Sequence, residues 1–158
     1  MELFVGSYSM NEPRFDAVYP KGGLMAGLGL SAAITSNFNI YLEAKYYSRT
    51  GKLTFSQEET TLTLIPISLG GRYIFPLGLF NPYVGAGADL YFYYEKNPIG
   101  DVLNHAAGYH IMGGAYIRFL KTLPLMLNLK LKYTMAKATE KDVQLGGFEY
   151  AAGLVFAF

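Results

Sequence analysis

Residues 40–49, IYLEAKYYSR, decide the fold because their side chains alternate between two kinds. Successive side chains of a β-strand point to opposite faces of the sheet. One face would carry Ile40, Leu42, Ala44 and Tyr46, and the other Tyr41, Glu43, Lys45, Tyr47 and Arg49. The first face has no charge, whereas the second has two basic residues and one acidic residue. Such a strand separates an apolar environment from a polar one.

The same alternation recurs along most of the chain, and no segment keeps a helical period. We expect seven further strands near residues 2–10, 23–34, 60–75, 82–95, 109–119, 125–134 and 148–158. In residues 2–10 the two faces are too similar to be assigned to a side. Pro66 lacks a backbone N–H, so we expect a bulge or a local break in the fourth strand.

The connections between these strands alternate in length. Short turns fall near residues 35–39, 76–81 and 120–124, and longer polar links near 11–21, 50–57, 96–104 and 137–142. An even number of strands brings both termini to the short-turn end, which is the layout of a transmembrane barrel. The sequence therefore predicts one domain over residues 1–158, an all-β, eight-stranded antiparallel up-and-down transmembrane β-barrel.

Composition excludes several classes of protein. Charged residues make up 16% of the chain, against roughly 25% in soluble domains. The net charge of +1 gives no basic field for nucleic acid. Cysteine is absent, so no disulfide or cysteine metal site is expected. No apolar run reaches the ~18 residues of a spanning helix. No signal peptide is recognisable at the N-terminus, so an exported protein would be in its mature form here.

The main structural alternative is a soluble eight-stranded barrel with the apolar face inside. Glycines crowd the polar face, which suits a narrow interior better than an exposed surface. The apolar face also carries more large side chains than an eight-stranded interior can hold. Aromatic residues gather near the strand ends, as interfacial girdles require, at Tyr73, Phe75, Phe92, Tyr94, Phe119 and Phe156. These features favour lipid outside and polar groups inside.

Two segments, FNPYVGAGADLYF at residues 80–92 and GFEYAAGLVFAF at residues 147–158, resemble the small outer-membrane β-barrel proteins of the OmpA/OmpX type. The resemblance covers nearly the whole chain as an architecture and implies a place in the bacterial outer membrane. It also implies that the barrel-insertion machinery recognises the last strand, through Tyr150, Leu154, Phe156 and Phe158. The chain departs from the family in lacking tryptophan, and without a peptidoglycan-binding domain a wall-anchoring role is not expected.

Polar chemistry must lie on the inward face. The charges expected there are Glu43, Lys45, Arg49, Arg72, Asp89, Glu95, Arg118, Lys130, Lys132 and Glu149. Counted from the short-turn end, Glu43 and Arg72 share one level and Asp89 and Lys132 another. Because side chains fill an eight-stranded barrel, we expect a plug of ion pairs, and the alternative is a path for protons or ions.

Catalysis would need a nucleophile, a base and an orienting group. The two histidines are separate, since His110 points into the expected interior and His105 lies at the rim. Near His105 in sequence is Asp101, whereas Ser48 or Ser56 could approach only from other links. Two isolated histidines make no zinc site, and Glu58, Glu59, Asp101 and Asp142 are too scattered for calcium. Glycine runs such as GAGAD lack the helix of a nucleotide-binding motif. We expect no enzyme activity, no cofactor and no metal.

The sequence thus predicts an integral outer-membrane barrel with a structural, adhesion or protein-interaction role. A narrow channel for ions or small solutes is the first alternative, and a lipid-modifying enzyme the second. Expected partners are membrane lipids such as lipopolysaccharide, the barrel-insertion machinery, and a protein bound through the outer loops. Residues 56–61, SQEETT, would continue the fourth strand above the membrane, where projecting strand edges could recruit another chain.

Overall fold

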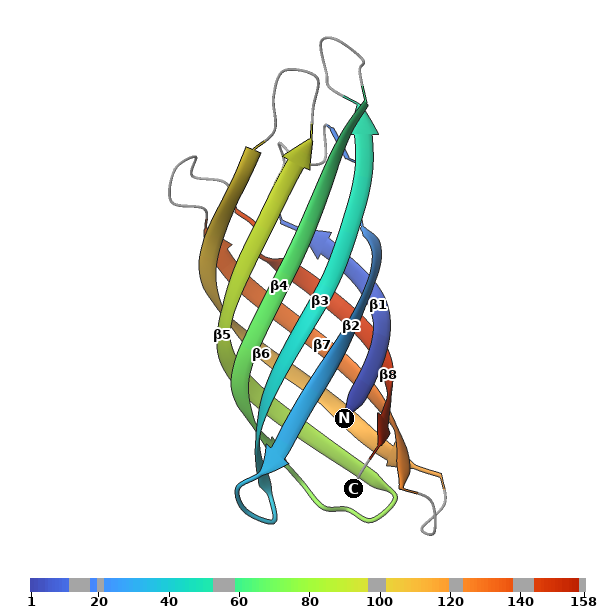
Figure 1. Ribbon diagram of the computed structural model, residues 1–158. Coiled ribbons are helices and arrows are strands. Elements are labelled where there is room, and N and C mark those ends of the chain that lie inside the picture. The colour runs from blue at the N-terminus through green and yellow to red at the C-terminus, as the bar shows by residue number, and fades with distance from the viewer. Residues whose placement is uncertain are drawn as a thin grey trace.

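Eight antiparallel strands close into one barrel in the computed structural model of this chain (Figure 1). The structure describes residues 1–11, 18–19, 22–52, 59–96, 102–119, 124–137 and 144–156, without the side chains of Glu95, Lys96 and Val102. The strands are β1 (Glu2–Met10), β2 (Gly23–Ala33), β3 (Phe38–Lys52), β4 (Glu59–Ile74), β5 (Phe80–Lys96), β6 (Val102–Arg118), β7 (Leu125–Lys137) and β8 (Gly147–Phe156). Each strand pairs with the next, and β1 pairs with β8. The predicted fold class is confirmed.

No helix in the described part of the chain is long and apolar enough to cross a membrane.

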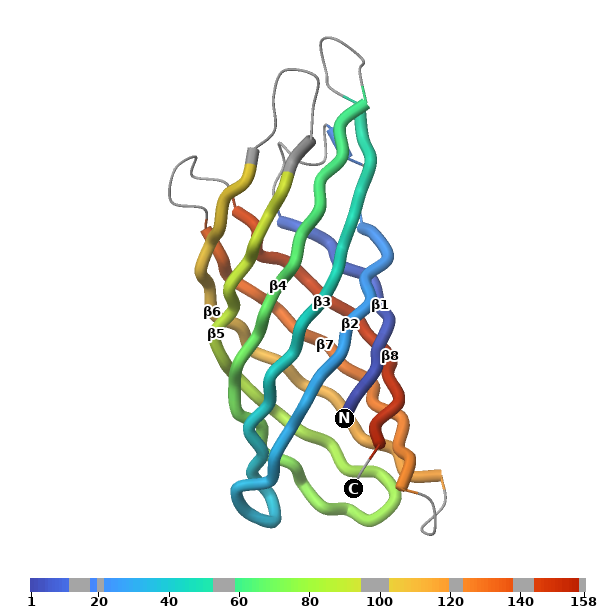
Figure 2. The backbone as a smooth tube through the Cα atoms, in the orientation of Figure 1, coloured from blue at the N-terminus to red at the C-terminus, as the bar shows by residue number. Residues whose placement is uncertain are grey.

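The two ends of the barrel differ. The turns at residues 34–37 and 75–79, the N-terminus and the end of β8 lie at one end, the short-turn end; the ends of β3 and β5 and the starts of β4 and β6 lie at the other, the long-link end (Figure 1). β3 to β6 have 15 to 17 residues, whereas β1, β2 and β8 have 9 to 11. The longer strands extend past their neighbours at the long-link end (Figure 2). Residues 56–61 were predicted to continue the fourth strand. β4 begins at Glu59, which confirms the prediction for residues 59–61, and residues 56–58 lie outside the described residues.

The β3–β4 ladder is interrupted beside Pro66 without a change of register. Pairing runs from Phe38 opposite Tyr73 to Ala44 opposite Ile67, and resumes at Tyr47 opposite Leu64. On its other side Pro66 stays in register opposite Tyr91. The missing donor therefore produces the local break expected from the sequence but no bulge.

The apolar face of the strands forms the outside of the barrel. Leu24 is 77% exposed and Ile111 59%, whereas Glu43 and Lys132 are each 1% exposed. In β1, Leu3 and Val5 point outward and Phe4 and Tyr8 inward, which resolves the strand that alternation left unassigned. This is the opposite of the soluble-barrel alternative.

Candidate functional site

Among the described residues, eight charged side chains are buried inside the barrel, each at most 5% exposed: Glu2, Glu43, Asp89, Glu149, Lys45, Arg72, Lys130 and Lys132. Four are acidic and four are basic, so their formal charges cancel. Charges removed from water are stable only when they are paired and hydrogen-bonded. Their arrangement therefore determines what the lumen can do.

Two lysines and two glutamates form a ring across the middle of the lumen. Lys45 Nζ lies 2.6 Å from Glu149 Oε2 and 3.4 Å from Glu43 Oε2. Lys130 Nζ lies 2.9 Å from Glu43 Oε2 and 3.3 Å from Glu149 Oε1. Lys130 also lies 3.8 Å from the centroid of the Phe4 ring, a cation–π contact. Because β3, β7 and β8 all contribute, this four-residue ring links separate walls of the barrel.

Asp89 is the centre of a second polar cluster. Its carboxylate accepts hydrogen bonds from Lys132 Nζ at 2.7 Å and Ser68 Oγ at 2.5 Å. His110 Nδ1 lies 2.7 Å from the other carboxylate oxygen. With Nδ1 donating to Asp89, Nε2 of His110 accepts the hydroxyl of Tyr41. Every member of this cluster has a partner within the protein.

A layer of tyrosines surrounds Arg72 nearer the short-turn end. The guanidinium carbon lies 4.9, 5.6 and 5.4 Å from the ring centroids of Tyr41, Tyr83 and Tyr116. Arg72 Nη1 is 3.8 Å from Glu2 Oε2, and Glu2 also accepts a 2.6 Å hydrogen bond from Asn128. We call Tyr41, Tyr83 and Tyr116, together with the Arg72 that they surround, the tyrosine layer; aromatic rings make up most of it.

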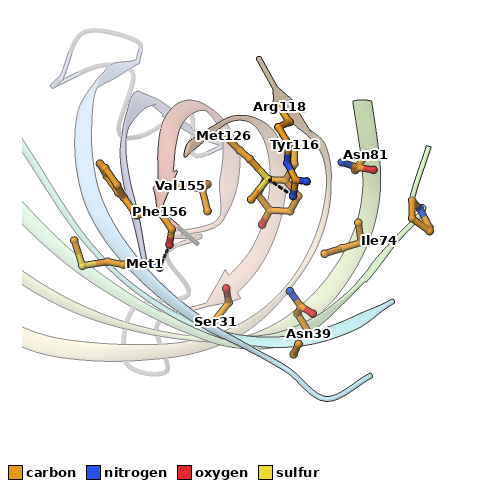
Figure 3. A pocket seen from close by; sticks show the side chains of 12 residues that line it. Met1, Ser31, Asn39, Ile74, Asn81, Tyr116, Arg118, Met126, Val155 and Phe156 are labelled. Carbon is orange, nitrogen blue, oxygen red and sulfur yellow. Dashed lines mark hydrogen bonds between the residues drawn. The ribbon is translucent and has the colours of Figure 1, made fainter. Parts of the chain in front are cut away.

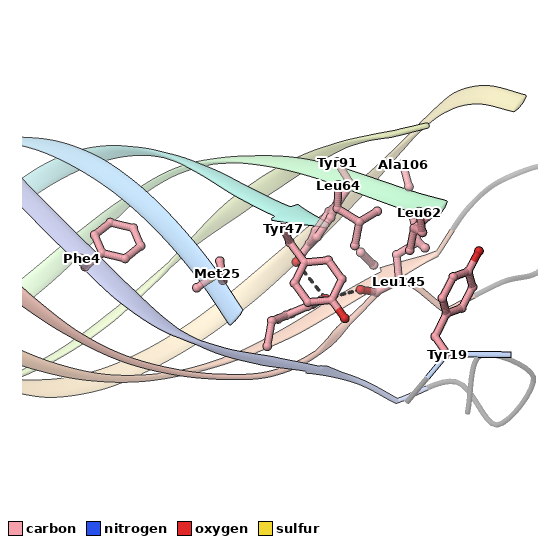
Figure 4. Close-up of a cluster of buried hydrophobic side chains, with 11 residues drawn as sticks. Phe4, Tyr19, Met25, Tyr47, Leu62, Leu64, Tyr91, Ala106 and Leu145 are labelled. Carbon is pink, nitrogen blue, oxygen red and sulfur yellow. Dashed lines mark hydrogen bonds between the residues drawn. The ribbon is translucent and has the colours of Figure 1, made fainter. Parts of the chain in front are cut away.

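Apolar and aromatic side chains fill the lumen toward the long-link end (Figure 4). This outer cluster includes Phe4, Tyr8, Tyr19, Met25, Tyr47, Leu62, Leu64, Tyr91, Ala106, Ala136 and Leu145. The Tyr8 hydroxyl donates to the Leu145 carbonyl oxygen, and the Tyr8 and Tyr47 rings pack edge to face with centroids 5.6 Å apart. Tyr19, in the first long link, is only 4% exposed. The outer cluster is a second layer of packing above the ion pairs.

The residues predicted for the lumen do not all meet. Glu43, Lys45, Arg72, Asp89, Lys130, Lys132 and Glu149 lie in the clusters above. Asp89 and Lys132 pair, as their shared level predicted. The predicted level of Glu43 and Arg72 is wrong, since Arg72 lies opposite Asn39, four residues from Glu43, and the two side chains have different partners. Arg49 and Arg118 are half-buried outside these clusters, and the Glu95 side chain lies outside the described residues.

Glu2 and the lumen tyrosines were not among the predicted site residues. Glu2 is two residues before Phe4 and so shares its inward face, a signal that the weak alternation of β1 concealed. The alternation places four tyrosines on the inward faces of their strands: Tyr41, Tyr83, Tyr91 and Tyr116. An inward position alone does not distinguish a tyrosine that fills space from one with a function. Charge on the inward face therefore predicted most of the ion-paired residues, but not Glu2 or the tyrosines.

The remaining candidate groups lie apart. His105 is exposed on the outer wall, whereas His110 is 1% exposed in the lumen, so the two histidines occupy opposite faces of β6. In the described part of the chain no three His, Cys, Asp or Glu residues could hold a metal ion. Tyr150, Leu154 and Phe156 point outward from β8, and Phe158 lies outside the described residues.

Comparisons with known proteins agree with this architecture. The family model of the outer membrane protein β-barrel domain matches residues 5–158. Neisserial surface protein A is 14% identical with a TM-score of 0.78, and the match covers 99% of this chain and 94% of that one. The N-terminal β-barrel domain of Pseudomonas aeruginosa OprF is 18% identical, with a TM-score of 0.63 over 99% and 97% of the two chains. Ail, the attachment invasion locus protein of Yersinia pestis, is 10% identical, with a TM-score of 0.58 over 97% and 96%. No curated protein matches in sequence.

Proposed function

We propose that this chain, which belongs to the outer membrane protein β-barrel family and lies in the bacterial outer membrane, is a non-conducting barrel that acts through its outer end. The observation that carries the proposal is the charge balance in the middle of the lumen, where the buried charged side chains among the described residues are four acidic and four basic. A selective pore needs a ring of one sign or a gate that dewets. Neutral, interlocked pairs instead favour a plug.

The outer end supports the second half of the proposal. β3 to β6 extend past the other strands there, and such projecting strands present a surface beyond the bilayer. The links that join strands at this end, residues 11–22, 53–58, 97–101 and 138–146, carry three basic and six acidic residues. Ail was solved with the heparin analogue sucrose octasulfate. An acidic excess disfavours a sulfated polyanion here and favours a protein partner with a neutral or basic surface.

Planar-bilayer recording tests the plug. Purified barrel inserted into a lipid bilayer is expected to give no stepwise current at ordinary transmembrane voltages, and vesicles containing it are expected to swell in small sugars no faster than empty vesicles. Reproducible unitary steps would contradict the non-conducting role.

Attachment assays test the outer end. We would compare bacteria that display the wild-type barrel with bacteria that display a variant in which residues 53–58 and 97–101 are replaced by Gly/Ser linkers, since loop tips tolerate such changes. The wild type is expected to attach better to host cells or to sister cells at equal surface density. Equal attachment of the two strains would leave only a structural role.

A narrow path for protons or ions is the second candidate. Two buried carboxylate oxygens, Glu43 Oε1 and Glu149 Oε1, have no hydrogen-bond partner within the protein. Groups of this kind often bind internal water, which favours some hydration of the lumen. The bilayer recording distinguishes the two candidates directly. Lipid modification has less support, because the two histidines lie on opposite faces of β6.

We also infer that the barrel-insertion machinery recognises β8, and that residues 1–158 act as one domain. Tyr150, Leu154 and Phe156 present an unbroken outward apolar row, which is consistent with a signal read before the barrel closes. Replacing Phe156 with Ser is expected to slow assembly in cells but not refolding of the purified chain in detergent. Equal delays in both settings would indicate a general folding defect.

A further inference from the structure

The short-turn end of the barrel opens into a vestibule of about 390 Å³ (Figure 3). A cavity of this size falls within the range of small-molecule sites. Its walls are largely apolar, with Ile74, Met126 and Val155 on three different strands. Pro76, in the β4–β5 turn, lines its mouth, so the vestibule faces the periplasm.

The vestibule is closed at its inner end. Tyr116 lines it and also belongs to the tyrosine layer, where its ring packs 4.9 Å from the ring of Tyr83 and lies over the guanidinium of Arg72. Beyond this layer lie the ion pairs of the lumen. A ligand would therefore enter and leave from the periplasmic side alone.

Arg118 is the one charged side chain among the described residues that line the vestibule, and the N-terminal ammonium of Met1, also at the lining, is bound to the Phe156 carbonyl oxygen. Arg118 is half-buried, and none of the ion pairs between described residues includes it. Among the described residues its only side-chain acceptor is the Met126 sulfur, 3.8 Å from Nη2, and a thioether is a weak acceptor. Since the deeper charges already cancel one another, the charge of Arg118 is not neutralised by the lumen. Figure 3 shows it across the vestibule from Ser31 and Asn39.

We propose that the vestibule binds a small monocarboxylate with a short apolar body, whose carboxylate pairs with Arg118. A guanidinium presents paired N–H donors that match a carboxylate. The apolar body would lie against Ile74, Met126 and Val155. The exposed Met1 ammonium already donates a 2.9 Å hydrogen bond to the Phe156 carbonyl oxygen. Arg118 is then the cation left for a ligand, and a phosphate monoester would leave excess charge between apolar walls. The site is independent of the non-conducting role and of the outer end.

Methionine NMR tests the proposal in the folded barrel, in detergent micelles with ¹³C-labelled methionine methyl groups. Met126 lines the vestibule, whereas Met25 is 1% exposed in the outer cluster and Met135 lies on the lipid-facing wall. Titration with hexanoate is expected to give a saturable shift of the Met126 methyl signal and none at Met25. Hexan-1-ol, which lacks the charge, is expected to give no saturable shift, and hexyl phosphate a weaker affinity than hexanoate.

Two variants at the ends of the barrel form a matched pair. Arg118→Gln is expected to weaken hexanoate binding on the order of tenfold or more, the loss of a charge-assisted contact. Arg49→Gln removes the same kind of side chain at the other end of the lumen and is expected to leave binding unchanged. If Arg118→Gln does not fold, Ala33→Phe fills the vestibule from the end of β2 without altering charge and is expected to abolish the shift.

Three results would overturn the site. Hexan-1-ol could shift Met126 as hexanoate does, Arg118→Gln could bind as the wild type does, or Met135 could follow Met126 at every concentration. The last result would mean that the probe only partitions into detergent. Tighter binding of hexyl phosphate than of hexanoate would refute the assignment to a monocarboxylate.

Discussion

Each buried charge in the lumen depends on its ion-pair and hydrogen-bond partners. Glu43 contacts Lys130 and Lys45, which are 5% and 3% exposed. If the Glu43 carboxylate is lost, the two buried lysines keep only Glu149 between them. Removing one partner of a buried ion pair costs more than removing both, because it leaves a charge without compensation. The same reasoning applies to Asp89, which holds Lys132, Ser68 and His110 together. The loss of stability on a single substitution therefore shows whether water can enter the cluster.

Glu43→Ala is expected to lower the free energy of unfolding by roughly 3 to 5 kcal/mol, because Lys45 and Lys130 would then share Glu149 alone and one buried positive charge would lack compensation. Reversible urea unfolding in lipid vesicles measures the change. The double variant Glu43→Ala, Lys130→Met is the control and is expected to recover part of the loss, since it removes one of those cations. A loss below ~1 kcal/mol for the single variant would mean that water replaces the carboxylate.

At the scale of the strand, period-two alternation was enough to predict which residues face lipid. The same alternation does not predict which side chains meet across the lumen. Strands in a barrel tilt against its axis, so residues counted equally far from a turn do not lie at equal heights. Glu43 and Arg72, counted to one level, therefore bind different partners, whereas Asp89 and Lys132 do meet. Glu2 was missed for a different reason: its short strand alternates too weakly to show its inward face. Facing follows from local sequence, but cross-lumen pairing depends on the closed barrel.

Two adjacent glycines on β6 give a test of this facing. A methyl group on Gly114 would collide with the Leu129 carbonyl and the Tyr83 ring, whereas on Gly113 its nearest contact would be a carbonyl oxygen 3.7 Å away. Gly114→Ala is thus expected to destabilise the barrel by roughly 1 to 3 kcal/mol, as overpacking does, and Gly113→Ala by much less. Thermal unfolding of the two variants in one detergent makes the comparison. Equal losses would show that the inner and outer faces of β6 are assigned incorrectly.

The outer face of the wall can be tested with one lysine. Leu129 is 45% exposed near the middle of β7, so Leu129→Lys is expected to cost about 2 to 4 kcal/mol in a bilayer. Leu103→Lys is the control, because Leu103 is 77% exposed near the long-link end of β6, where a lysine meets water. Unfolding in lipid vesicles measures both. A tolerated Leu129→Lys would place this part of the wall outside the bilayer.

The whole molecule contains three layers in series: the outer cluster, the ion pairs with their Asp89 cluster, and the tyrosine layer. The wall itself is held by backbone ladders between every pair of neighbouring strands, so the filling can be changed while the barrel stays closed. Layers in series resist passage independently. If the barrel is non-conducting, as we propose, opening one layer is expected to be insufficient to let ions through.

This arrangement predicts the behaviour of a neutral double variant. Lys45→Ala with Glu149→Ala removes the 2.6 Å pair without changing net charge, but the outer cluster and the tyrosine layer still obstruct the lumen. We expect no stepwise current from this variant in planar bilayers. Adding Tyr8→Ala and Tyr83→Ala thins the other two layers, and the combined variant is expected to show small unitary steps. Current from Lys45→Ala, Glu149→Ala alone would show that the ion pairs are the sole barrier and that the aromatic layers are permeable.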